Sequence, residues 1–396
     1  MQAMLASAAR APESLALYVH LPWCVRKCPY CDFNSHRAPG ALPVADYVRA
    51  LAADLDHDLA TWPELALRPV TSVFFGGGTP SLFPPSAIAD ILAHAGRRLA
   101  LSGDAEITLE ANPGTTEHGR FEGYRQAGVN RISLGVQSFD DRLLRRLGRI
   151  HGAAEARAAA GSVAAAGFDR CNLDLMYALP GQDLAGALAD LDAALALAPG
   201  HVSHYQLTLE PNTAFAAQPP PGLPDDDLAA AMMEACQARL ADAGYGHYET
   251  SAYALPGQAC RHNLNYWRYG DFLGIGAGAH GKLTVAGQVR RRWKLRHPRA
   301  FMDAAGGAAA VGGDQALAAA DLPFDFLLNA LRLAEGVPAG LFEARTGLPL
   351  AAIAPALDRA RQRGLLADDP DRLVATGLGQ RFLNDLLTLF LPASRR

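Results

Sequence analysis

The feature that most constrains the fold is a repeat of short apolar runs and amphipathic stretches between residues 15 and 245. Apolar runs of this length are typical of buried strands, and the longer stretches have the 3.6-residue period of helices. The expected strands are Leu15–Leu21, Val70–Phe75, Glu106–Glu110, Arg131–Val136, Asn172–Leu179 and Val202–Leu209, and the expected helices are Val44–Ala60, Pro85–Arg98, Ala153–Ala166, Leu184–Leu197 and Asp226–Ala243. Strand–helix repeats produce parallel strands joined by right-handed crossovers. We therefore expect an α/β fold, a partial (βα)6 TIM-like barrel, with a doubly wound open sheet as the alternative.

The rest of the chain is expected to form smaller units around this core of residues 15–245. Residues 1–14 are expected to be a flexible leader, residues 246–304 a segment packed on the core, and the glycine-rich residues 306–313 a flexible junction. Over residues 314–396, helices followed by a small hairpin predict a C-terminal α+β, winged-helix-like domain. Such domains often bind DNA, but acidic residues occupy the predicted turn at 368–372, which argues against that role.

Charge and composition exclude several classes of protein. The chain has 36 basic and 40 acidic residues, a net charge of -4, so no net positive field attracts nucleic acid or anionic lipid. No window approaches the roughly 18 uninterrupted apolar residues of a membrane-spanning helix, and the first twelve residues lack the pattern of a secretory signal. We therefore expect a cytoplasmic protein. Its 6 cysteines are too few for a disulfide scaffold.

Three of these cysteines form the strongest local signal. Cys24, Cys28 and Cys31 follow the first expected strand with the spacing C-x3-C-x2-C. Three thiolates can hold three irons of a 4Fe-4S cluster and leave the fourth iron open to a small molecule. The alternative is a structural zinc site with His20 or His36 as the fourth ligand, although zinc sites usually pair two separate knuckles of ligands.

Further polar residues stand at the carboxyl ends of the next strands. Gly76–Gly78 and Thr79 follow the second strand, and their backbone amides can meet a ligand or simply form a tight turn. Glu110 ends the third strand, where a carboxylate can accept both hydroxyls of a ribose or lie on the surface. Gln137 ends the fourth. Because this face of a parallel barrel holds the active site, we expect these side chains to converge on one pocket.

The fifth strand carries Asp174, an acid in an apolar run. A buried acid needs a partner, and a structural ion pair with Arg149 is one explanation.

The cysteine loop and the residues after it resemble those of the radical S-adenosylmethionine (SAM) family. The resemblance implies that the open iron binds the methionine part of SAM, which the reduced cluster cleaves to a 5'-deoxyadenosyl radical. Over roughly residues 15–390 the chain is similar to the oxygen-independent coproporphyrinogen oxidase group of that family. This similarity implies a set of SAM-binding residues: Tyr18, Tyr30, Gly77, Gly78, Thr79, Glu110, Gln137, Arg149 and Asp174.

Two departures separate the chain from the dehydrogenase of that group. The dehydrogenase has a further cysteine two positions after the third ligand, where this chain has Phe33, and it carries a longer N-terminal extension. The segment His262-Asn263-Leu-Asn-Tyr266-Trp267 instead resembles the H-N-x-x-Y-W motif of the HemW-type haem chaperone branch, which is associated with haem binding. A neutral imidazole is a usual axial ligand of haem iron, and Tyr and Trp can pack on a porphyrin. Cys260, two residues earlier, is the alternative ligand.

The resemblance implies a haem carrier rather than an enzyme with the oxidase's turnover. Its implied cofactors and partners are a 4Fe-4S cluster, SAM, haem, an electron donor for the cluster, apo-haemoproteins of the respiratory chain, a second copy of the chain in a homodimer, and peripheral membrane contact through the recipients. The first alternative is an oxygen-independent coproporphyrinogen III dehydrogenase, and the second is a radical methyltransferase or a haem-cleaving enzyme. The basic run Arg290–Arg292, with Lys294 and Arg296, is expected to form a solvated face, or else to meet haem propionates or an acidic partner.

Overall fold

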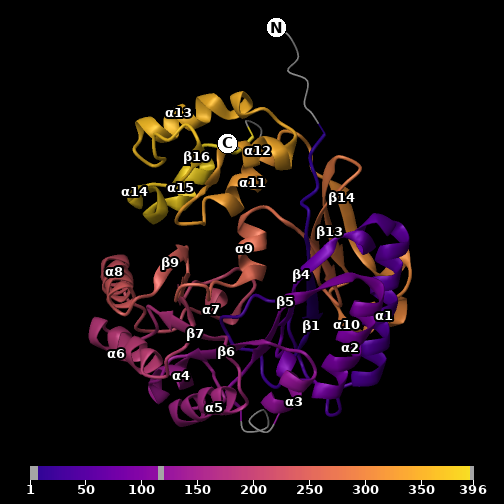
Figure 1. Ribbon diagram of the computed structural model, residues 1–396. Coiled ribbons are helices and arrows are strands. Elements are labelled where there is room, and N and C mark those ends of the chain that lie inside the picture. Colours follow the sequence, from indigo (N-terminus) through magenta and orange to yellow (C-terminus); the bar gives the residue numbers. More distant parts are fainter. Residues whose placement is uncertain (1–7, 115–119, 393–396) are drawn as a thin grey trace.

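The computed structural model describes residues 8–114 and 120–392. Its centre is a row of six parallel strands in one sheet, ordered as they occur in the chain (Figure 1). These strands are β1 (Leu15–Leu21), β4 (Pro69–Gly77), β5 (Ala100–Ala111), β6 (Arg131–Gln137), β7 (Cys171–Tyr177) and β8 (His201–Gln206). Each overlaps one of the six strands predicted from the sequence, although β5 begins before the predicted Glu106 and β8 ends before the predicted Leu209, and the partial (βα)6 barrel is confirmed.

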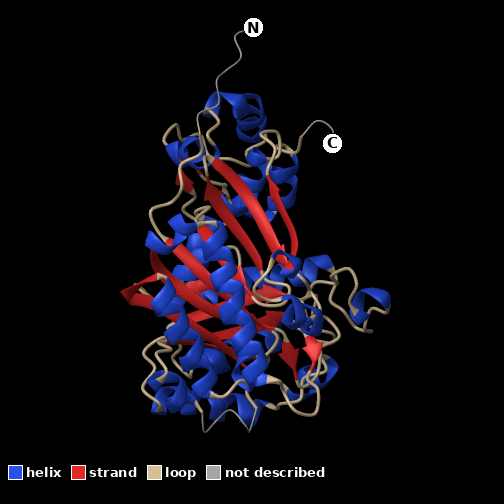
Figure 2. Cartoon of the chain, turned by 90° about the vertical axis from the view of Figure 1, so that its right-hand side faces the viewer, coloured by secondary structure: helices blue, strands red, loops and turns tan. Residues whose placement is uncertain are grey.

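Helices lie over one face of this sheet (Figure 2). The predicted helices are confirmed to within two residues at each end as α1 (Val44–Thr61), α2 (Pro85–Arg98), α5 (Ala153–Ala165), α6 (Leu184–Leu195) and α8 (Asp226–Asp242). Two begin at an aspartate whose carboxylate accepts a backbone N–H of the first turn: Asp183 caps α6 and Asp225 caps α8. Further helical elements around the core include η1 (Pro63–Leu67), η2 (Pro80–Leu82), α3 (Phe121–Gln126), α4 (Asp141–Arg146), α7 (Ala214–Ala217) and α10 (Pro298–Ala304).

The sheet extends beyond the predicted strands at both edges, to 12 strands in all. Beside β1 it continues through β11 (Asp271–Ile275), which is parallel to β1, and then through β12 (His280–Val285), β13 (Gln288–Lys294) and β14 (Val311–Ala316), which are antiparallel. Beside β8 it ends with β10 (Ala252–Ala254) and β9 (Gly246–Glu249). The segment after residue 245 is therefore part of the same sheet.

The sequence suggested a flexible junction at the glycine-rich residues 306–313, but the structure shows regular elements there. They form η3 (Ala308–Ala310) and the start of the edge strand β14, which pairs with β13. A Cβ on Gly313 would lie 2.0 Å from the ring of Trp293, so the glycine lets this strand pass directly over the indole.

The basic run on β13 is also not a uniformly solvated face. Arg292 and Lys294 are buried, whereas Arg291, on the opposite face of the strand, pairs with Asp325, and the half-buried Arg290 pairs with Asp314 of β14. Lys294 Nζ lies 2.5 Å from Asp54 Oδ1 and 2.8 Å from Asp58 Oδ2, both on α1. The alternation of a strand thus divides the run between the core and the surface.

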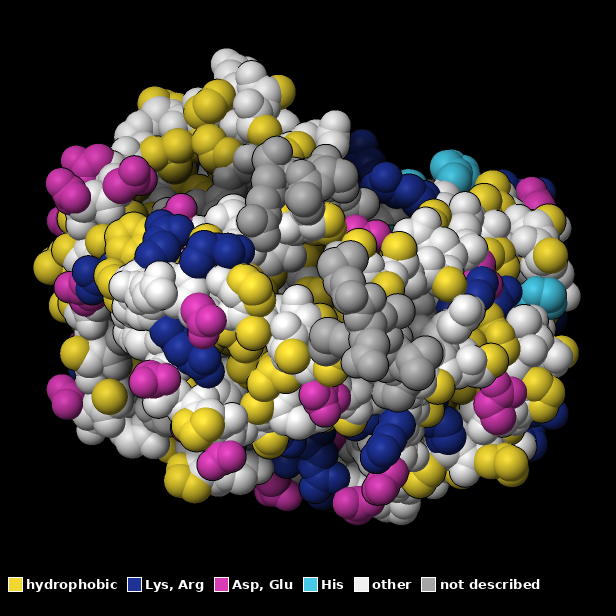
Figure 3. Space-filling view, turned by 90° about the horizontal axis from the view of Figure 1, so that it is seen from above, with side chains coloured by type: hydrophobic (Ala, Val, Ile, Leu, Met, Phe, Trp, Pro, Cys, Tyr) yellow, Lys and Arg dark blue, Asp and Glu magenta, His cyan; other side chains and the backbone are white. Residues whose placement is uncertain are grey.

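The C-terminal part has a hydrophobic core of its own, in which Phe326 and Phe342 meet edge to face. It comprises α11 (Leu322–Ala330), α12 (Ala339–Thr346), η4 (Leu350–Ile353), α13 (Ala354–Gln362), α14 (Gly377–Arg381), α15 (Leu383–Thr388), and the paired strands β15 (Val337–Pro338) and β16 (Arg372–Leu373). The expected hairpin is present, because Leu366 bridges Ala375 in antiparallel fashion. On the face seen from above, basic and acidic side chains are interspersed (Figure 3).

Residues 8–14 run along this C-terminal part. The backbone N–H groups of Ala9 and Arg10 donate to the carbonyls of Gly287 and Ala344, so this part of the expected flexible leader is anchored, while residues 1–7 lie outside the described residues. Among the residues that the structure describes, no helix is long and apolar enough to span a bilayer.

Candidate cofactor site

The three clustered cysteines lie on a loop that is closed at its base by a small parallel sheet. Cys24 ends β2 (Trp23–Cys24), which pairs with β3 (His36–Arg37). Inside the loop the N–H of Cys31 donates to the carbonyl of Cys28 (3.2 Å). Lys27 Nζ crosses the loop to the carbonyl of Phe33 (3.1 Å). The loop is therefore ordered, with all three thiols partly exposed.

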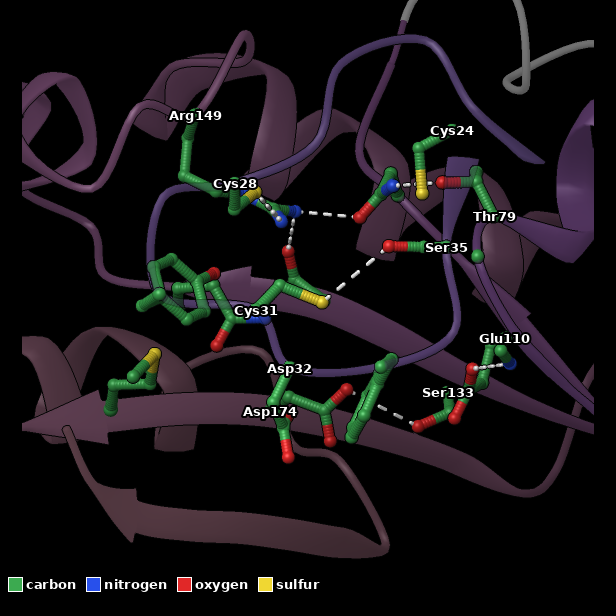
Figure 4. Close-up of a pocket in the computed structure, with 18 of the residues that line it drawn as sticks. Cys24, Cys28, Cys31, Asp32, Ser35, Thr79, Glu110, Ser133, Arg149 and Asp174 are labelled. Carbon is green, nitrogen blue, oxygen red and sulfur yellow. Dashed lines mark hydrogen bonds between the residues drawn. The ribbon is translucent and has the colours of Figure 1, made fainter. Parts of the chain in front are cut away.

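These thiols open onto a cavity of about 330 Å³ at the carboxyl ends of the parallel strands. The residues expected at the site that line it are Cys24, Cys28, Tyr30, Cys31, Gly77, Gly78, Thr79, Glu110, Gln137, Arg149 and Asp174. In Figure 4 the cysteines occupy one side of the cavity, and the carboxyl groups of Glu110 and Asp174 the other. Tyr18 is the exception, since it lines an adjoining cleft that shares Gly77 and Glu110 with this cavity.

Arg149 connects the cysteine loop to the sheet. Its Nη1 donates to Cys28 Sγ (3.5 Å), and its Nη2 donates to Asn112 Oδ1 (2.6 Å) and to the carbonyl of Gly135 (2.7 Å). Asn112 in turn donates to Thr79 Oγ1 (2.8 Å). Sequence reasoning missed Asn112, although it lies two residues after Glu110 and is visible there as a polar side chain at a strand end.

The ion pair suggested between Arg149 and Asp174 is not formed. Asp174 instead accepts from Asn172 Nδ2 (2.7 Å) and from the Ser133 hydroxyl (3.5 Å). Burial is the main cause that raises the pKa of Asp174 above its ordinary range. Burial, followed by the charge of Asp174, raises the pKa of Glu110 to about 8. The two carboxyl groups thus make an acidic wall that holds protons readily when no ligand covers it.

Glycine is required at Gly77 and Gly78 because neighbouring atoms leave no room for a Cβ, and not because their backbone amides are free to bind a ligand. A Cβ on Gly77 would lie 2.4 Å from the His20 ring, and one on Gly78 would lie 2.5 Å from the carbonyl oxygen of Trp23. The amides themselves are occupied: Gly77 donates to Glu110 Oε2 (3.2 Å), Gly78 to the carbonyl of Leu21 (2.9 Å), and Thr79 to the carbonyl of Trp23 (2.8 Å). The glycines therefore bring β4 against the cysteine loop and fix its base.

The H-N-x-x-Y-W segment forms α9 (Arg261–Trp267), between the core sheet and the C-terminal helices. His262 is 1% exposed, and both of its ring nitrogens are occupied, Nδ1 by the Ser72 hydroxyl (2.9 Å) and Nε2 by the Tyr266 hydroxyl (2.8 Å). Burial lowers the pKa of His262 to about 3, so its imidazole is neutral.

The other residues of this segment face different surroundings. Tyr266 reaches the adjoining cleft, whereas Trp267 lies under the guanidinium of Arg332, 4.4 Å from its ring centre. Asn263 is half-buried on the same helix. Cys260, just before α9, is fully buried and donates to Glu106 Oε1 (3.3 Å). The segment thus contributes only Tyr266 to the cleft.

The residues of the main cavity fit an iron–sulfur cluster with one open iron. All six cysteines are described, and only the three on the loop line the cavity, so a cluster held there would have three protein ligands. Arg149 Nε is buried in the cavity wall without a hydrogen-bond partner among the described residues. Within those residues, no three His, Cys, Asp or Glu side chains gather closely enough to hold a single metal ion.

Comparison with known proteins places the chain in a family. Residues 18–194 match the model of the radical SAM superfamily, and residues 317–382 match that of the HemN C-terminal domain. The chain is 51% identical to the heme chaperone HemW of Escherichia coli over 95% of its own length and 98% of the relative's. The chain belongs to the heme chaperone HemW family. The HemW of Haemophilus influenzae is 48% identical over the same share of each chain.

The fold is similar to that of a solved radical SAM enzyme. Coproporphyrinogen III oxidase (HemN) of Escherichia coli superposes with a TM-score of 0.80 over 98% of this chain and 91% of that one, at 22% identity. At that level of identity the likeness concerns the fold, whereas the similarity to HemW extends to the sequence of almost the whole chain. The expectation of a radical SAM fold in the HemW branch is confirmed.

Proposed function

We propose that Cys24, Cys28 and Cys31 hold a 4Fe-4S cluster whose fourth iron takes SAM. The observation that carries this proposal is the convergence of three thiols and the acidic wall on one cavity. A cluster with an open iron supplies a coordination site and an electron for the bound sulfonium compound. In this chain the carboxyl groups of Glu110 and Asp174 would accept the ribose hydroxyls of SAM. Tyr30, Gln137, Arg149 and the 77–79 segment would shape the rest of its site, and Tyr18 would border it from the adjoining cleft.

The chain's own function, in this proposal, is to bind haem and to transfer it to apo-haemoproteins. Support comes from relatives named heme chaperone HemW that match along 95% of the chain. Phe33 supports it further, because an exposed phenyl ring, 59% accessible, stands at the mouth of the cavity where the dehydrogenase group has another cysteine. Respiratory-chain recipients, an electron donor, a homodimer, a membrane contact through the recipients and a location in the cytoplasm belong to the same proposal.

A haem-loading titration of the purified full-length chain tests the carrier function. The protein is reconstituted anaerobically with iron and sulfide, and haem is titrated against it with and without the cluster. Stoichiometric binding, followed by release to an apo-haemoprotein, is expected. A parallel anaerobic assay with reductant, SAM and coproporphyrinogen III should give no protoporphyrinogen. Sustained formation of protoporphyrinogen would contradict the carrier function and support the dehydrogenase. A product heavier by one methyl group would indicate a radical methyltransferase, and a product with an opened ring would indicate a haem-cleaving enzyme.

A further inference from the structure

The buried residues of the H-N-x-x-Y-W segment do not present a ligand to haem iron. An imidazole coordinates iron through a nitrogen lone pair, and a neutral imidazole has one such lone pair and one N–H. In His262 both nitrogens are already hydrogen-bonded, to Ser72 and Tyr266, in a site that is 1% exposed. The thiol of Cys260 is equally enclosed and is bonded to Glu106. Ligation by either would require α9 to leave the sheet.

The adjoining cleft lined by Tyr18 lies directly beside the cavity of the three cysteines, called the cluster cavity below. Its volume is about 650 Å³, which is in the range of cofactor sites, and it shares Asp32, Phe33, Gly77 and Glu110 with the cluster cavity. Aromatic side chains from four parts of the chain line it: Tyr18, Tyr266, Phe272 and Trp293. The cleft therefore offers a flat apolar ligand a suitable surface, next to the proposed redox centre.

One imidazole faces this cleft without a hydrogen-bond partner. His280 begins β12, and no hydrogen bond joins its ring nitrogens to any other described residue. The exposed ring is roughly parallel to that of Trp293 of β13, with 6.2 Å between the centroids and 21° between the planes. Burial, and after it the charges of Arg291 and Arg296, lower the pKa of His280, which favours the neutral form.

Arg296 supplies a positive charge on the same wall. It lines the cleft, and its side chain forms no ion pair among the described residues. A porphyrin with propionate groups needs such a partner at the edge of its site, since a carboxylate and a guanidinium form strong paired hydrogen bonds. The cleft thus combines an iron ligand, an aromatic lining and a cation for the carboxylates.

We propose that haem binds in this cleft, with His280 as its axial iron ligand and Arg296 paired with a propionate. The proposal rests on the haem-carrier function proposed above. His262 then acts as a positioning residue: through its hydrogen bond to the Tyr266 hydroxyl it holds that ring at the cleft wall, where Tyr266 also meets Phe272 edge to face, 4.3 Å between centroids. This arrangement gives the motif a role in haem binding without direct ligation.

The test is a haem titration of the full-length, cluster-reconstituted chain, followed by absorbance and resonance Raman spectra. His280→Gln is expected to weaken haem binding at least tenfold and to remove the spectral signature of an imidazole ligand, which added imidazole should restore in His280→Gly. His262→Phe should weaken binding less and keep the imidazole signature. His297→Gln is the matched control, because this exposed histidine lies next to Arg296 but outside the cleft lining.

The results separate this assignment from the carrier function on which it rests. Wild-type binding with an imidazole signature that survives in His280→Gln and disappears in His262→Phe would overturn the assignment and leave the carrier function intact. A wild-type chain that binds no haem would overturn both. Far-UV circular dichroism and the thermal midpoint of each variant identify misfolding. If His280→Gln fails to fold, Arg296→Gln decides: unchanged haem affinity in that variant would overturn the proposed cleft.

Discussion

Arg149 donates a hydrogen bond to the sulfur of Cys28 across 3.5 Å, and it reaches this position from the loop after β6 and α4. The same guanidinium is fixed on its other side by Asn112 and by the carbonyl of Gly135. A positive donor held against a ligand of the proposed cluster would stabilise the more negative, reduced state of that cluster. Through this one side chain the sheet would raise the reduction potential of the proposed cluster.

Replacement of this side chain should make the cluster harder to reduce. We expect Arg149→Gln to lower the reduction potential of the reconstituted cluster by about 60 mV, the equivalent of a tenfold change in a one-electron equilibrium. A redox titration monitored by electron paramagnetic resonance measures the shift. Arg145→Gln, an exposed arginine on the neighbouring α4, serves as the control. An equal potential in the wild type and Arg149→Gln would mean that this contact does not influence the cluster.

The ability of the cysteine loop to hold iron should be sensitive to a single methyl group added just after β4. In Gly78→Ala the new Cβ would meet the Trp23 carbonyl oxygen at 2.5 Å, a distance that forces the base of the cysteine loop to move. We expect most of the iron to be lost on reconstitution, as measured by iron and sulfide analysis. Gly96→Ala is the control, since its Cβ meets nothing within 4 Å on α2 and should stabilise the helix by up to about 1 kcal/mol. Full iron content in Gly78→Ala would contradict the packing argument.

The cysteines themselves divide into two groups with different expected effects. Cys24→Ser, Cys28→Ser and Cys31→Ser should each abolish stable cluster binding, because the cavity holds no fourth thiol to replace the lost one. Cys171→Ala should keep the full iron content, since this thiol lies on β7 and only donates weakly to its neighbour's carbonyl. Iron retained by any of the three serine variants, or zinc found in the wild type, would exclude the proposed cluster.

Much of the fold was predictable because its strands are locally defined. Leu15–Leu21 is a mostly apolar run, with His20 as its one polar residue, and a proline follows it; the structure places β1 on the same residues. Strand β14 was missed for the opposite reason: its residues, Val311–Ala316, are mostly glycine and polar, and they become a strand only because β13 and the Trp293 indole lie beside them. Such a tertiary contact leaves no trace in the local pattern.

The same distinction applies to the site. Residues at the carboxyl ends of the parallel strands were predicted to meet because the topology brings those ends together, and Glu110 and Gln137 do line one cavity. The surroundings of His262 could not be predicted. They depend on Ser72, which is 190 residues away in the sequence and lies on β4, whereas His262 lies on α9. A sequence motif therefore identifies which residue matches the family, but it does not show whether the ring nitrogens of that residue are already hydrogen-bonded.

The raised pKa of Glu110 predicts that the stability of the folded chain, without cluster or ligand, depends on pH. Its pKa is raised from 4.5 to about 8 in the folded protein, so the fold favours the protonated carboxyl. The resulting stabilisation is complete below about pH 4.5 and is lost as the pH rises through about 8. Glu110→Gln stays neutral, and its thermal midpoint should exceed that of the wild type by several degrees at about pH 8.5, equivalent to at most about 5 kcal/mol, and nearly match it at about pH 5. A difference that does not change with pH would contradict this assignment.

The buried cation Lys294 should contribute strongly to stability, because it is the closest positive charge to two buried carboxylates. Its ammonium lies within 2.8 Å of Asp54 and Asp58, and it ties β13, which carries Trp293 of the proposed haem cleft, to α1. Lys294→Met would leave these acids without their main partner, and we expect a loss of about 3–5 kcal/mol in the free energy of unfolding, measured with denaturant. Arg299→Met removes an exposed pair with Asp303 and should cost at most about 0.5 kcal/mol.

A further variant separates unpaired charge from lost packing. Adding Asp54→Asn and Asp58→Asn to Lys294→Met removes the uncompensated carboxylates while nearly preserving their volume, so a large part of the lost stability should return. If the triple variant were as unstable as Lys294→Met alone, the methylene chain of the lysine rather than its charge would be what stabilises the contact between α1 and β13. The haem titration of Lys294→Met then has a clear expectation as well: weaker binding, because the strand that positions Trp293 against His280 has lost its anchor on the helix.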